Sequence, residues 1–168
     1  MNTDKSDKLV KKWKNSTNPL NRICITAKRK FNSSVEKVFP LLCPTTEYDW
    51  LPGWNGQLLH SRSDYAEYNC IFKSNYFGPE EIFVCTRFEK NKAVDYSRTS
   101  ENLCAKLDIS LIDNCDGTVT GLWVVTASAL NESGNKLIQH PQEAQAHLNA
   151  AIDALEYYVN TGEMISVG

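Results

Sequence analysis

The order of hydrophobic and polar positions divides this chain into a strand, a short helical stretch, a long run of strands and a final helix. Residues 23–31 alternate between apolar and polar side chains, which is typical of a strand with one buried face. Apolar residues at helical spacing follow and predict a short helix over residues 34–42, weakened at Pro40. One further helical turn fits residues 45–50.

Strands are expected to fill the middle of the chain, because short apolar segments alternate with turn signals there. Asp116-Gly117 is the strongest of these signals, since Asp-Gly favours a tight hairpin turn with positive φ. The expected strands span residues 57–63, 67–74, 81–89, 93–99, 103–114 and 117–130.

The last part of the chain has a helical period. A polar loop over residues 131–141 precedes an apolar stripe that runs from Ala144 to Val159 and ends before Gly162. A single amphipathic helix and a sheet with one apolar face bury each other best, so we predict an α+β fold. In it, a curved seven-stranded antiparallel sheet wraps around the long C-terminal helix, with two short helices between the first and second strands. Small residues on the helix, Ala144, Ala151 and Ala154, would leave a cavity against the concave sheet.

Several segments carry a family resemblance. They are residues 34–39 after the first strand, residues 43–54, residues 67–72, residues 126–135 and the closing residues 157–162. In this order the chain resembles the START-like helix-grip superfamily, and within it the SRPBCC, or polyketide cyclase/dehydrase-like, group. The resemblance covers residues 21–162 and implies the helix-grip fold. It leaves function open, because the superfamily includes lipid carriers, hormone receptors, cyclases and chaperone cofactors.

Composition and charge argue against several classes of partner. The 168 residues include 18 Lys or Arg and 20 Asp or Glu, for a net charge of −2. Such a chain lacks the positive field that attracts phosphate backbones, so we expect no nucleic-acid partner. Its apolar runs are far shorter than the roughly 20 residues of a membrane span.

The ends of the chain lie outside the predicted domain. We expect a basic N-terminal extension over residues 1–20, one domain over residues 21–162 and a C-terminal tail over residues 163–168. The extension has no apolar signal core, so a cytoplasmic location is expected. It fits either a short amphipathic helix around Trp13 or a frayed tail.

The cysteine and histidine positions predict neither disulfides nor a metal site. The six cysteines stand singly, without the Cys-x-x-Cys spacing of a zinc site, and the three histidines form no ligand cluster with them. We therefore expect reduced cysteines, no metal and no cofactor.

Residues 47–54 concentrate the candidate chemistry, because two acids and three aromatic residues precede or flank a Pro-Gly turn there. Aromatic rings supply apolar area and a few acids orient a ligand, so this segment is interpreted as the rim of a pocket. An equally simple interpretation is a turn whose tryptophans fill the end of a core. The predicted ligand-binding residues are Tyr48, Trp50, Trp54, Glu67, Phe72, Arg87, Trp123 and His147.

Three functions remain open at this stage. The first is binding of a small hydrophobic or amphipathic ligand between the sheet and the C-terminal helix. The second is a cyclase or dehydratase (lyase) type of enzyme, for which Glu47, Asp49 and His147 are the candidate proton carriers. The third is a protein-interaction module. The oligomeric state is not predicted.

Overall fold

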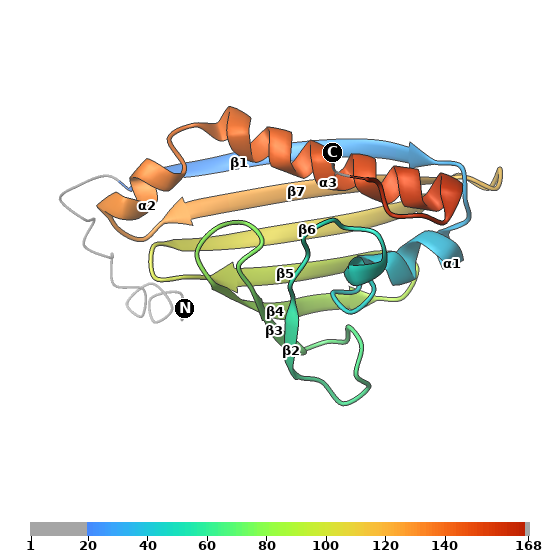
Figure 1. Cartoon of the computed structure of the whole chain (residues 1–168), viewed down its shortest axis with the longest axis horizontal. Helices are drawn as coiled ribbons and strands as arrows, with labels where there is room; N and C mark the ends of the chain where they lie inside the picture. Colours follow the sequence, from blue (N-terminus) through green and yellow to red (C-terminus); the bar gives the residue numbers. More distant parts are fainter. Residues whose placement is uncertain (1–19, 167–168) are drawn as a thin grey trace, which may run out of the picture.

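The computed structural model describes residues 20–166 and has the predicted α+β architecture (Figure 1). The expectation of a basic extension concerns residues that lie almost entirely outside this range. The strands are β1 (Arg22–Phe31), β2 (Gln57–His60), β3 (Ile71–Ser74), β4 (Glu81–Glu89), β5 (Ala93–Thr99), β6 (Leu103–Asp113) and β7 (Val119–Ala129). The helices are α1 (Val35–Val38), α2 (Glu132–Leu137) and α3 (Pro141–Thr161), with 3-10 turns η1 (Phe39–Leu42) and η2 (Glu47–Asp49).

All seven strands form one antiparallel sheet in the order β1-β7-β6-β5-β4-β3-β2. The first and last strands are therefore neighbours, and α3 lies along them across one face of the sheet (Figure 1). Burial alternates along the whole of β7, as expected for a sheet with one covered face. Helix α3 buries Ile152 and Leu155 on this side and ends at Gly162, whose φ of 75° is the left-handed conformation of a helix C-cap.

The prediction that residues 131–141 form a loop is wrong in one respect, because this segment contains the helix α2. Asn131 caps this helix, since its side-chain oxygen accepts a hydrogen bond from the backbone N–H of Gly134 at 2.9 Å. Gly134 is required by a close contact: a Cβ atom here would lie 2.2 Å from the carbonyl oxygen of Asn102. A stretch rich in Asn and Gly conceals this helix in the sequence.

Three other predicted elements are shorter than expected, and the first is the strand over residues 57–63, since β2 ends at His60. The helix over residues 34–42 changes from α1 to the 3-10 turn η1 next to Pro40, whose missing N–H cannot continue an α-helix. The strand expected over residues 67–74 begins only at Ile71, because Asn69 has a φ of 68°. The segment between β2 and β3 is therefore a longer loop than predicted.

Within residues 20–166, no helix is long and apolar enough to cross a membrane.

Candidate functional site

A cavity of about 220 Å³ lies between α3 and the face of the sheet that the helix covers. Strands β1 and β3–β7 form its floor, α3 forms its roof, and residues 42–54 close one side. Ala144 and Ala151 of α3 border the cavity, so the roof is built partly from small side chains, whereas the third predicted alanine, Ala154, is buried and does not border it. Its apolar wall includes Ile25, Trp50, Trp54, Phe72, Phe83, Leu107, Trp123 and Ile152.

The tryptophans of the side wall are held by hydrogen bonds to nearby backbone. The Nε1–H of Trp50 donates to the carbonyl oxygen of Leu41 at 2.9 Å, and that of Trp54 donates to Pro44 at 2.8 Å. The Trp54 ring also packs edge-on against Phe72, which in turn stacks on Phe83. Because both indole N–H groups are satisfied inside the protein, these side chains offer the cavity apolar surface.

Glu47 is an acid in this apolar wall. It opens the turn η2, and its carbonyl oxygen accepts a hydrogen bond from the backbone N–H of Leu51 at 2.8 Å. Its carboxyl group receives no hydrogen bond and no salt bridge from any residue in the range 20–166. Burial disfavours the ionised form and raises the pKa of Glu47 to about 8, so the carboxyl is largely protonated at neutral pH.

Two tyrosines are close enough to Glu47 for its charge to affect them. The Glu47 carboxylate and burial both raise the pKa of Tyr96, and they act in the same direction on Tyr76. Tyr96 lines the cavity, and its hydroxyl donates to the carbonyl oxygen of Leu42 at 3.1 Å. The Tyr96 hydroxyl therefore donates its hydrogen bond to the backbone and not to the Glu47 carboxyl.

An ion pair between Glu81 and Arg98 lies elsewhere in the wall and was not among the predicted site residues. Arg98 Nη1 is 2.7 Å from Glu81 Oε2, and the two side chains are only 15% and 6% exposed. The guanidinium also lies 4.7 Å from the centre of the Phe77 ring. Burial raises the pKa of Glu81 despite the opposing effect of Arg98, so desolvation outweighs the attraction.

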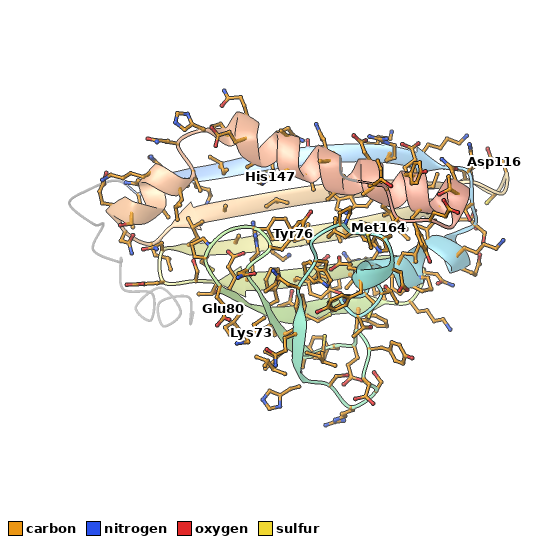
Figure 2. All side chains as sticks on the ribbon, viewed as in Figure 1. Lys73, Tyr76, Glu80, Asp116, His147 and Met164 are labelled. Carbon is orange, nitrogen blue, oxygen red and sulfur yellow. The ribbon has the colours of Figure 1, made fainter. Side chains whose placement is uncertain are left out.

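Six of the residues singled out from the sequence border the cavity: Glu47, Trp50, Trp54, Phe72, Trp123 and His147. His147 lies on α3, and it is exposed as well as lining the cavity, which places it at the rim (Figure 2). The structure therefore brings together residues from the turn η2, two strands and the last helix.

Tyr48 and Asp49 do not line the cavity, which corrects their place in the predicted set. Both are exposed in the turn η2 and neither borders the cavity. The Tyr48 hydroxyl donates a hydrogen bond to the carbonyl oxygen of Gly56 at 2.6 Å, which links the turn η2 to the segment before β2. Adjacent residues of one turn point in different directions, and the sequence pattern did not show which of the two acids faces inward.

Glu67 and Arg87 also lie outside the cavity. Glu67 sits in the loop before β3, where its Oε1 accepts a hydrogen bond from the backbone N–H of Arg62 at 2.6 Å. A break in the β4–β5 register between Cys85 and Arg87 ends the alternation that would have kept Arg87 on the face of Phe83. Arg87 is instead 45% exposed and pairs with Glu89 at 2.8 Å.

Metal-binding side chains do not gather in the part of the chain that the structure describes, where no three His, Cys, Asp or Glu residues form a cluster suited to an ion. All six cysteines are free thiols in the structure. The polar residues that line the cavity are thus Glu47, Tyr96, Ser100, the Glu81–Arg98 pair and His147.

Comparison with solved structures identifies the fold. CalU16 from Micromonospora echinospora is similar over 86% of this chain and 85% of its own, with a TM-score of 0.57 and 14% identity. Norcoclaurine synthase from Thalictrum flavum, solved with dopamine and hydroxybenzaldehyde, matches over 89% and 96%, with a TM-score of 0.60 and 10% identity. DynU16, a protein of the dynemicin biosynthetic locus, has a TM-score of 0.60 and 12% identity over 83% of this chain. That match covers 48% of DynU16, so this chain spans about half its length.

No protein-family model matches the sequence, and no curated protein matches it either. The similarity in structure is nevertheless extensive, and it agrees with the strand order and with the position of α3. The chain has the helix-grip fold of START-like, polyketide cyclase-like proteins, as its sequence predicts.

Proposed function

We propose that this protein binds a small hydrophobic or amphipathic molecule in the cavity between α3 and the sheet. The observation that supports the proposal is a largely apolar cavity of about 220 Å³ with a carboxyl group, Glu47, that has no partner in its wall. Small-molecule sites usually measure about 300–1,000 Å³ and combine apolar walls with a few polar groups. The volume of this cavity lies below that range, which favours a ligand of one ring or a short chain.

The architecture of the wall supports binding over simple core filling. A well-packed core of this size would hold few voids larger than a water molecule. Here, four aromatic side chains, Trp50, Trp54, Phe72 and Trp123, border one continuous space. Hydrogen bonds to backbone carbonyls fix Trp50 and Trp54, and Trp54 also packs edge-on against Phe72.

Filling the cavity from α3 should abolish binding. We expect Ala151→Phe to place a ring in the cavity and to weaken binding of any ligand by at least about tenfold, which corresponds to about 1.4 kcal/mol. Ala150→Phe is the matched control, because Ala150 is exposed on the same helix while Ala151 lines the cavity. Native mass spectrometry of the purified proteins would show a co-purified ligand, and calorimetry would then give its affinity. Equal binding by the two variants would contradict the proposal.

A second candidate is acid–base catalysis in the same cavity, and the Glu47 carboxyl favours it. A group whose pKa is about 8 can give up and take back a proton near neutral pH, as a general acid or base must. Once a bound molecule is identified, incubation with the wild type and with Glu47→Gln tests this function. Conversion of the molecule by the wild type alone supports catalysis, and binding without conversion by both proteins supports the carrier function.

A further inference from the structure

Two of the charged groups around the cavity form an ion pair and one acid has no partner, and this difference indicates the charge of the ligand's head group. Glu81 and Arg98 neutralise each other at 2.7 Å. Glu47 has no such partner among residues 20–166, and the groups that face it, Tyr76 and Tyr96, are neutral phenols. The cavity therefore has one uncompensated charge when Glu47 is ionised, and that charge is negative.

The surroundings of Glu47 also suit a cation. Trp50 follows Glu47 by one helical turn, and Trp54 and Tyr96 border the same cavity. Aromatic faces attract ammonium groups, most strongly where water is excluded. A carboxylate combined with several aromatic rings is the chemistry that recognises alkylated amines. An anionic head group would instead meet Glu47 with a like charge.

We infer that the ligand of this cavity carries a positively charged amine, which pairs with the carboxylate of Glu47 while its apolar part lies against α3 and the sheet. This inference rests on the proposed function and specifies the class of its ligand. It follows from the position of the half-buried Glu47 in the cavity wall, from the absence of a partner for it within the described chain and from the aromatic residues that border the same space.

The pairing has a pH dependence that follows from linkage. A cation binds the ionised carboxyl, so binding must release a proton wherever Glu47 is protonated in the free protein. Burial raises the pKa of Glu47 to about 8, so the affinity for a cation should increase as the pH approaches that value. The other charged or titratable groups of the cavity wall are Glu81, Arg98 and His147. A Glu47→Gln variant retains all three of these groups, so it separates their effects from that of Glu47.

The test uses three probes with one tail and different heads: hexyltrimethylammonium, hexanoate and hexan-1-ol. The quaternary ammonium cannot lose a proton, so any pH dependence of its binding belongs to the protein. We expect its affinity for the wild type, measured by calorimetry, to increase about tenfold between about pH 6 and pH 8. Glu47→Gln should lose this dependence. Asp49→Asn, which removes the same charge two residues away at an exposed position, should retain it.

The outcomes distinguish the inference from the function on which it rests. Binding of hexan-1-ol without binding of hexyltrimethylammonium would overturn the inference and leave the proposed cavity function intact. Tighter binding of hexanoate would also overturn it and would point to Arg98. Failure of all three probes would count against both the inference and the proposed function. If Glu47→Gln does not fold, a wild-type affinity for the ammonium that is the same at both pH values still refutes the inference.

Discussion

Replacement of Trp54 by alanine is expected to lower the free energy of unfolding by about 3 kcal/mol, because it removes a large side chain from the wall between the cavity and the core. Trp54 is only 8% exposed, and it packs edge-on against Phe72 and Tyr76. Its indole also closes over Gly56, where a Cβ atom would lie 2.4 Å from the ring. One face of the ring already borders empty space, so the cost should fall at the lower end of the range for buried aromatic residues.

Urea unfolding followed by circular dichroism measures this effect, and Tyr48→Ala is the control. Tyr48 comes from the same aromatic segment but is 51% exposed, and its main contribution is one hydrogen bond to Gly56. Its removal should cost about 1 kcal/mol. Similar losses for the two variants would show that Trp54 is not part of the packed wall. Trp54→Ala should also enlarge the cavity, so it should accept longer tails than the wild type does.

Periodicity was sufficient to predict most of the fold. The alternation along residues 117–130 identified a strand with one buried face, and the Asp116-Gly117 hairpin fixed its pairing with the preceding strand. The stripe from Ala144 to Val159 located α3 to within a few residues. These patterns are local, and burial of one face per element dictates them directly.

The site was less predictable because it depends on contacts between distant residues. Glu81 and Arg98 lie on adjacent strands, on the same face as Phe83 and Tyr96, but their pairing follows only from the β4–β5 register. The same register contains the irregularity that turns Arg87 outward, and a one-residue bulge leaves little trace in a sequence. Alternation along β4 and β5 was the available signal for the ion pair, since it puts both charged residues on the inner face.

Glu47 illustrates a conflict between local rules and function. An acid in the first turn of a short helix is ordinary, because it can stabilise the end of the helix or face solvent. The structure places this half-buried acid in an apolar wall without a partner among residues 20–166, an arrangement that costs stability whenever the acid ionises. Residues that break a general rule in this way are concentrated at functional sites.

Ionisation of the Glu47 carboxyl should lower the stability of the folded protein, so the free energy of unfolding should decrease as the pH rises. The folded-state pKa of about 8 lies above the value of about 4.3 for an unfolded chain, so the folded protein binds more protons between these limits. Stability from the neutral carboxyl is thus fully present below about pH 4.3 and is lost as the pH rises toward about 8. The greatest slope is about 1.4 kcal/mol per pH unit, and access of water to the cavity should reduce the total loss to about 2 kcal/mol.

Glu47→Gln should therefore be more stable than the wild type by about 2 kcal/mol near pH 8 and nearly equal to it near pH 5, since glutamine has the same shape and no charge to desolvate. Urea unfolding of both proteins across this range measures the difference. Glu81, whose pKa burial also raises, titrates alike in both proteins, so its contribution cancels. Asp49→Asn should follow the wild-type curve, because Asp49 is exposed. Parallel curves for wild type and Glu47→Gln would mean that Glu47 is hydrated in solution, and the proposed pairing with a cationic ligand would lose its electrostatic basis.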